Sequence, residues 1–154
     1  MASGAIGLVL ARPTRLLGVE PFFMELIGGM EERFVERGLS VLLHVVPGLD
    51  AEMEAYRRWA ASGLTDAVVV VNLVDDDPRP ALLRELGLTA VLVGDMDDQD
   101  HAVVRTDDEG PMRDVAMRLV ARGHRRLARV TGPAGLTHTR GRTRALLAVA
   151  AEAG

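Results

Sequence analysis

The sequence predicts an open α/β fold in which a mostly parallel sheet carries helices on both faces. Short apolar segments rich in Val, Leu and Ile alternate along the chain with longer segments of helical periodicity. These apolar segments are continuous, a pattern typical of parallel strands buried on both faces. In addition, one joint recurs at residues 36–41, 85–91 and 121–127: a helix end, a glycine, a short loop and a strand start.

Each element is predicted from its local pattern. The predicted strands are Ile6–Arg12, Ser40–Val46, Ala67–Asn72, Thr89–Gly94, Val103–Arg105 and Leu127–Thr131. The predicted helices are Pro21–Arg37, a helix capped by Asp50 that runs to about Ser62, Pro78–Leu86, a helix capped by Asp107 or Asp108 that runs to Arg122, and Thr139–Ala153.

The first two predicted helices show a helical repeat along one side. In the first, the stripe consists of Phe22, Leu26, Met30 and Phe34, spaced four apart. In the second, one side carries Met53, Tyr56, Arg57 and Ala60. Gly38 suits the left-handed position beyond the end of the first helix.

Composition bounds the possible functions. At 154 residues the chain forms one domain, or one domain and part of another. It has no cysteine, which excludes disulfides and thiolate chemistry, and every basic residue is arginine, which excludes lysine chemistry. The net charge of −4 argues against binding of this chain to the phosphate backbone of a nucleic acid. We find neither a membrane-spanning apolar run nor a secretory signal, so a cytoplasmic protein is expected.

Polar side chains follow several strands where ligands bind in open α/β sheets. Arg12 and Arg15 follow the first strand, Asn72 closes the third and Asp95 follows the fourth. Because parallel strands share one carboxyl edge, these groups indicate a pocket for a small polar molecule. Phe22 could be a wall of that pocket, and packing in the core is an equally good interpretation of it.

Motifs for an enzyme or a metal protein are not found. The turn after the first strand reads Ala11-Arg12-Pro13, not the glycine-rich dinucleotide motif, and Gly132–Gly135 lacks the lysine of a phosphate loop. There is no nucleophile elbow, the four histidines are scattered, and Asp95–Asp100 lacks the glycine and glutamate of a calcium loop. We therefore expect no catalysis, no cofactor and no metal.

Several segments together resemble the effector-binding core of LacI/GalR-type transcriptional regulators. They include Pro21-Phe-Phe-Met-Glu-Leu-Ile-Gly-Gly, Asp66-Ala-Val-Val-Val-Val and Thr106-Asp-Asp-Glu-Gly110. The similarity continues through Arg122-Gly-His-Arg-Arg-Leu and Arg142-Thr-Arg-Ala-Leu146. It covers nearly the whole chain from Ile6, and the Gly-His-Arg-Arg segment downstream of Asp-Asp-x-Gly is its most specific part.

The resemblance implies a periplasmic-binding-protein-like core with two lobes and a sugar or nucleoside effector between them. On that basis Arg12, Phe22 and Asn72 would face the effector from the first lobe, and Arg142 would reach it from the second. It also implies a homodimer that binds operator DNA through a helix-turn-helix headpiece, which this chain is expected to lack. Three positions depart from the family pattern: Asp108, Ala145 and Leu146.

The expected organisation is a leader over residues 1–5, a first lobe over 6–104 and the incomplete beginning of a second lobe over 105–154. The apolar side of the last helix is expected to pack against a second copy of the chain or to be mobile. Two alternatives remain open. A solute-binding lobe of a transport system would need an export signal, and a small flavodoxin-like enzyme would need a phosphate loop or a base opposite a nucleophile.

Overall fold

The computed structural model describes residues 3–13 and 21–154. Its sheet has five strands in the order β2-β1-β3-β4-β5. The strands are β1 (Ala5–Ala11), β2 (Ser40–Val46), β3 (Ala67–Val70), β4 (Thr89–Val93) and β5 (Ala102–Val104). The β1–β2, β1–β3 and β3–β4 ladders are all parallel. The predicted fold class, an open parallel α/β sheet, is confirmed.

The chain divides into two compact units, each formed by three segments that are not consecutive in sequence. Unit 1 consists of residues 1–71, 78–92 and 98–102, and unit 2 of residues 72–77, 93–97 and 103–154. The chain thus leaves unit 1 after Val71 and returns to it at Pro78. In the part of the chain that the structure describes, no helix is long and apolar enough to cross a membrane.

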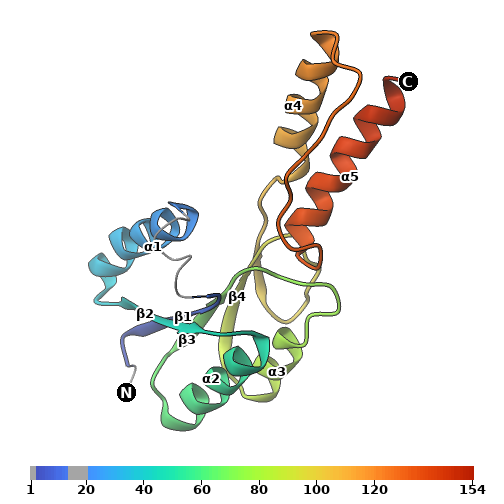
Figure 1. Cartoon of the computed structure of the whole chain (residues 1–154). Coiled ribbons are helices and arrows are strands. Elements are labelled where there is room, and N and C mark those ends of the chain that lie inside the picture. Colours follow the sequence, from blue (N-terminus) through green and yellow to red (C-terminus); the bar gives the residue numbers. More distant parts are fainter. Residues whose placement is uncertain (1–2, 14–20) are drawn as a thin grey trace. The chain divides into compact units, whose positions relative to one another are not determined.

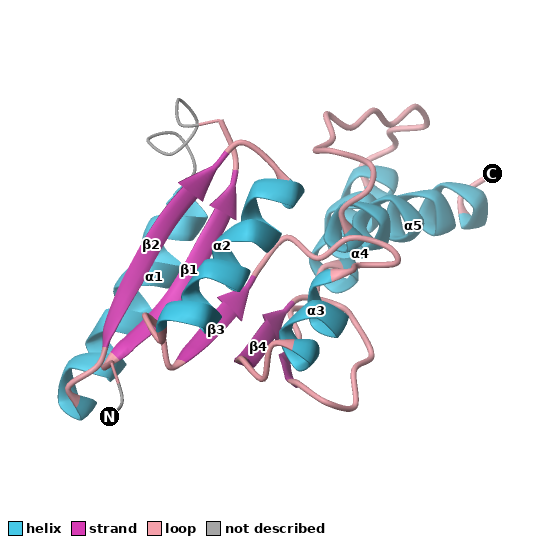
Figure 2. Cartoon of the chain, turned by 90° about the horizontal axis from the view of Figure 1, so that it is seen from below, coloured by secondary structure: helices cyan, strands magenta, loops and turns pink. Residues whose placement is uncertain are grey.

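Unit 1 is a three-layer arrangement. Helix α1 (Pro21–Phe34), extended by the 3-10 turn η2 (Val35–Arg37), covers one face of the sheet, and α2 (Leu49–Ser62) and α3 (Arg79–Glu85) cover the other (Figures 1 and 2). The central strands supply the core because both of their faces are covered: Leu8, Leu10, Val68 and Val70 are fully buried.

The inward faces of α1 and α2 differ from the predicted stripes. In α1 the buried residue is Phe23, and Phe22 is 57% exposed, about 100° further round the helix. In α2 the buried residues are Glu52, Ala55, Tyr56 and Trp59. Of the predicted side, Tyr56 is buried, Met53 and Ala60 are half-buried, and Arg57 is exposed. Glu52, which was not on the predicted side, is buried and paired with Arg79.

The start of helix α2 differs from the predicted one. Helix α2 begins at Leu49 after Gly48, so Asp50 lies in its first turn and does not cap it. A carboxylate there still interacts favourably with the positive end of the helix. The three predicted joints have their glycines in the left-handed region, with φ of 65° at Gly38, 65° at Gly87 and 91° at Gly123.

Unit 2 contains two helices that lie side by side, α4 (Glu109–Ala121) and α5 (Thr137–Glu152) (Figure 1). Small residues lie buried on them, Ala116 on α4 and Ala145 on α5, together with Val149. Helix α5 therefore packs on α4 within one chain and begins two residues before the predicted Thr139.

The predicted strand Leu127–Thr131 was wrong. This segment has no regular structure, and Val130 is fully exposed. Its apolar alternation suits a strand, but a strand forms only where its backbone groups pair with another strand. Within residues 3–13 and 21–154, no strand pairs with this segment. The neighbouring predicted strand Val103–Arg105 is found one residue earlier, as β5.

Candidate functional site

In unit 1, Arg12 directly follows β1 and is held in place by two neighbours. Its backbone N–H donates a hydrogen bond to the Val46 carbonyl (2.9 Å), and its guanidinium carbon lies 4.7 Å from the centre of the Phe23 ring. That stacking is a cation–π interaction. The exposed Phe22 ring meets Phe23 edge-on at 5.2 Å. Phe23, which was not among the predicted site residues, therefore contacts both Arg12 and Phe22.

Asn72, which follows β3, has an unusual backbone conformation. Its φ is 54°, and that of Asp76 in the same turn is 50°. Left-handed conformations are uncommon outside glycine, and Asn and Asp tolerate them best. Such residues often occur at functional sites, where the surrounding structure holds them. The segment 72–77 belongs to unit 2.

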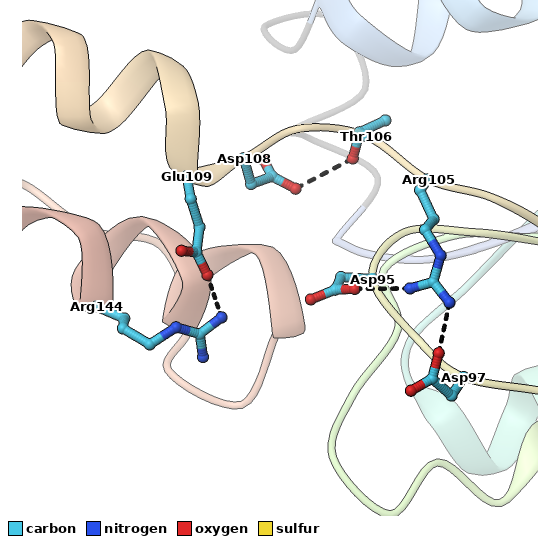
Figure 3. Close-up of polar contacts among 7 residues, drawn as sticks. All are labelled: Asp95, Asp97, Arg105, Thr106, Asp108, Glu109 and Arg144. Atoms are coloured by element: carbon cyan, nitrogen blue, oxygen red, sulfur yellow. Dashed lines mark hydrogen bonds and ion pairs between the residues drawn. The ribbon is translucent and has the colours of Figure 1, made fainter.

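Unit 2 contains a cavity of about 470 Å³, within the range of small-molecule sites. Most of its lining residues are polar or charged, and they come from the loop after β4, from the residues after β5 and from the N-terminal turns of α4 and α5. The lining residues are Asp95, Arg105, Thr106, Asp107, Asp108, Glu109, Thr137, His138 and Gly141. Figure 3 shows several of these side chains, which come from segments far apart in the sequence.

Arg105 is fixed by two carboxylates. Its guanidinium donates to Asp95 at 2.9 Å and to Asp97 at 2.5 Å (Figure 3). The hydrogen bond with Asp97 and the negative charges of both carboxylates raise the pKa of Arg105, so the group stays charged. The arrangement presents donors and acceptors side by side at the cavity wall, which suits vicinal hydroxyl groups.

The first turn of α4 is held by its acidic residues. Asp107 Oδ1 accepts a hydrogen bond from the Gly110 N–H at 2.8 Å, so Asp107 supplies the side-chain cap. Asp108 accepts from the Thr106 hydroxyl and from Arg142 Nε, the latter at 2.9 Å, and Glu109 pairs with Arg144 (Figure 3). Arg142 and Asp108 also line a neighbouring cavity of about 340 Å³.

The predicted site residues are distributed over both units. Arg12 and Phe22 lie in unit 1, whereas Asn72, Asp95 and Arg142 lie in unit 2. Arg15 lies outside the described residues. Within unit 2, Asp95 lines the larger cavity and Arg142 the smaller one. The predicted site did not include Arg105, although it directly follows a strand as Arg12 does, nor His138, for which the sequence carried no signal.

Comparison with known proteins shows that the chain is similar to bacterial transcriptional regulators. No protein-family model matches it. It is 34% identical over 135 residues to the HTH-type transcriptional regulator AglR of Rhizobium meliloti, covering 86% of this chain and 37% of the relative. It is 30% identical over 154 residues to the HTH-type transcriptional regulator CelR of Thermobifida fusca, covering 96% and 45%. The chain thus spans less than half the length of these relatives.

The fold is also similar to that of transcriptional regulators whose structures are solved. A transcriptional regulator CelR–cellobiose complex superposes with a TM-score of 0.85 at 27% identity, covering 99% of this chain and 47% of the other. A LacI family regulator from Bifidobacterium animalis gives a TM-score of 0.83 at 27% identity, covering 99% and 54%.

The parallel sheet and its helices are those of the periplasmic-binding-protein-like cores found in such regulators. The chain is similar in sequence and fold to LacI-type transcriptional regulators over part of their length. These relatives do not favour the transport lobe or the flavodoxin-like enzyme.

Proposed function

We propose that this chain is the ligand-sensing part of a LacI-type transcriptional regulator and that its effector is a sugar. The observation that carries the proposal is the unit 2 cavity, in which Arg105 and four carboxylates line a space of about 470 Å³. Carboxylates accept hydrogen bonds from hydroxyl groups and a guanidinium donates to them. The similar regulator CelR, whose structure is that of a cellobiose complex, supports the same class of ligand.

The lining distinguishes a sugar from the other candidate effectors. Arg105, the one arginine in the lining, is already paired with Asp95 and Asp97, so it is a poor partner for an anionic ligand. None of the described residues that line this cavity is a Phe, Tyr or Trp on which a nucleobase could stack. A neutral polyhydroxyl molecule therefore fits the cavity better than a nucleotide or a nucleoside.

The test is calorimetric titration of the protein with cellobiose and a panel of neutral mono- and disaccharides. Asp95→Asn removes a charged acceptor from the cavity wall. Since a hydrogen bond to a charged group contributes about 1.5–3 kcal/mol, the Kd of a bound sugar should rise by roughly 10- to 100-fold.

Asp97→Asn is the matched control. Asp97 pairs with the same Arg105 but is absent from the cavity lining and almost fully exposed. Its replacement should change sugar affinity less than about twofold, as expected of a surface ion pair. Equal losses in both variants, or no sugar bound at all, would contradict the proposal.

The remaining features of the parent regulator follow from the same proposal. It acts in the cytoplasm as a homodimer and contacts operator DNA through a helix-turn-helix segment. It has no catalytic role. Arg12, Phe22, Asn72 and Arg142 are further effector ligands in the complete core. The division into a first lobe over residues 6–104 and a second from residue 105 belongs to this proposal too.

A further inference from the structure

Unit 1 contains a buried ionic network that the proposed sensing role does not use. Glu52 on α2 and Arg79 at the start of α3 form an ion pair of 2.8 Å, with side chains only 2% and 3% exposed. The fully buried Tyr56 donates its hydroxyl hydrogen to the same Glu52 oxygen at 2.6 Å. Glu52 and Arg79 are 27 residues apart in sequence, so no local pattern predicts their pairing.

Arg79 makes a further bond that connects the network to the end of β3. Its Nη1 donates to the carbonyl oxygen of Val71 at 3.0 Å. Strand β3 ends at Val70, and its last paired residue is Val70 opposite Leu92. The buried Val71 carbonyl lies beyond this ladder, where it needs another donor. Arg79 provides that donor.

This bond lies at the base of the segment 72–77. The segment leaves unit 1 after Val71 and returns at Pro78, next to Arg79. Its middle is anchored separately in unit 2: Leu73 accepts a hydrogen bond from the Thr137 N–H at 3.0 Å, and Asp75 pairs with Arg140 at 2.5 Å. Arg79, two residues after the segment, is therefore bonded to Val71, the residue directly before it.

Stability alone does not account for such a network. Transferring an ion pair from water into a protein interior costs several kcal/mol per ion, and an apolar pair of similar volume is often equally stable. What an apolar pair could not supply is the donor for the Val71 carbonyl. The role of the charges is therefore to fix a backbone position.

We propose that Arg79 is a positioning residue, with Glu52 as its buried counter-charge. By holding the Val71 carbonyl, Arg79 closes the base of segment 72–77 and maintains the left-handed turn that begins at Asn72. This inference does not depend on the sugar site, because it concerns the conformation of the ligand-free chain.

The test is hydrogen–deuterium exchange of the ligand-free protein, comparing the wild type with the double variant Glu52→Leu/Arg79→Met. Removing both charges together leaves no orphaned ion, so the fold should survive. Amides of residues 72–77 should exchange about tenfold faster or more, as expected on losing a hydrogen bond to a charged group. Amides of β1 and α2 should keep their wild-type rates.

Two further variants make the result specific. Tyr56→Phe removes the hydroxyl from Glu52 but leaves the bond between Arg79 and Val71, so exchange at 72–77 should stay at the wild-type rate. Arg79→Lys keeps the charge, but its single ammonium on a different stem cannot serve both Glu52 and Val71. It should reproduce the local increase even if the double variant does not fold.

Unchanged exchange at 72–77 in both Arg79 variants would overturn the proposal. So would an equal increase across all of unit 1, because that would show a purely stabilising network.

Discussion

Gly7 shows how one residue type can be dictated by a single neighbour. It lies in β1 opposite the indole of Trp59, and a Cβ at this position would stand 2.3 Å from Trp59 Cζ3 and 2.8 Å from Cε3. Real Cβ atoms do not approach other atoms so closely, so the ring would have to move. Trp59 is itself only 6% exposed, which leaves it little room.

We predict that Gly7→Ala destabilises the protein by about 1–3 kcal/mol through overpacking. Urea unfolding followed by Trp59 fluorescence measures the change. Gly28→Ala is the control, because a Cβ there meets nothing within 4 Å. Alanine is also preferred over glycine inside a helix by roughly 0.5–1 kcal/mol. Equal stability of Gly7→Ala and the wild type would show that Trp59 can move aside.

Among single residues, Asp66 also makes a pH-dependent contribution. Its carboxylate accepts hydrogen bonds from the N–H groups of Ser3 (2.7 Å) and Gly4 (2.8 Å), and these bonds lower its pKa below the ordinary value of 3.8. They also show that Ser3 and Gly4, predicted to belong to a leader, are attached to the fold.

A lowered pKa in the folded state stabilises the protein above the unfolded pKa, and that contribution is lost as the pH falls through the folded value. Asp66→Asn should therefore be less stable than the wild type near pH 7, and the difference should shrink below about pH 3.8. Urea midpoints measured across this range test the prediction. A difference that stays constant with pH would exclude ionisation of Asp66 as its source.

At the scale of elements, the contact between α4 and α5 depends on small residues. Ala116 and Ala145 are fully buried on these helices. Several ion pairs join the helices as well, such as Arg144 with Glu109, but exposed pairs contribute at most about 1 kcal/mol. The close packing of the alanines is therefore expected to decide the stability of this pair.

We predict that Ala145→Leu separates the helices and destabilises unit 2 by about 1–3 kcal/mol. Hydrogen exchange should accelerate in α4 and α5 but not in β1. Ala151→Leu places the same side chain at an exposed position of α5 and should have little effect. If both variants behaved alike, packing at Ala145 would not be what holds the helices together.

For the whole molecule, the division into two units predicts that unfolding is not a single step. Unit 1 contains most of the buried apolar residues, including the only tryptophan, Trp59. Unit 2 buries few large side chains on its two helices. Hydrophobic burial is the main favourable term in folding, so unit 2 should unfold at the lower urea concentration.

The measurement compares two probes in one titration. Trp59 fluorescence reports on unit 1, and far-ultraviolet circular dichroism also reports on the helices of unit 2. The dichroism should begin to fall before the fluorescence changes, since non-coincident transitions indicate more than two states. Coincident curves would mean that the two units unfold together.

Much of the fold could be predicted because its signals are local. Five of the six predicted strands and the glycines at 38, 87 and 123 depend on neighbouring residues only, and they appear close to where they were expected. The site was predicted less completely. Asp95 lines a cavity because a strand end placed it there, but Phe23, Arg105 and His138 were missed.

By itself, the amino-acid sequence determined the order of helices and strands, the parallel sheet and the kinship with LacI-type regulators. Only the tertiary structure decided that Leu127–Thr131 forms no strand, that Phe23 lies beneath Arg12, and that Glu52 meets Arg79 inside the core. The reason is physical. Backbone propensities and apolar periodicity act over a few residues, whereas a ladder partner, a stacking ring or a buried counter-charge comes from a distant part of the chain.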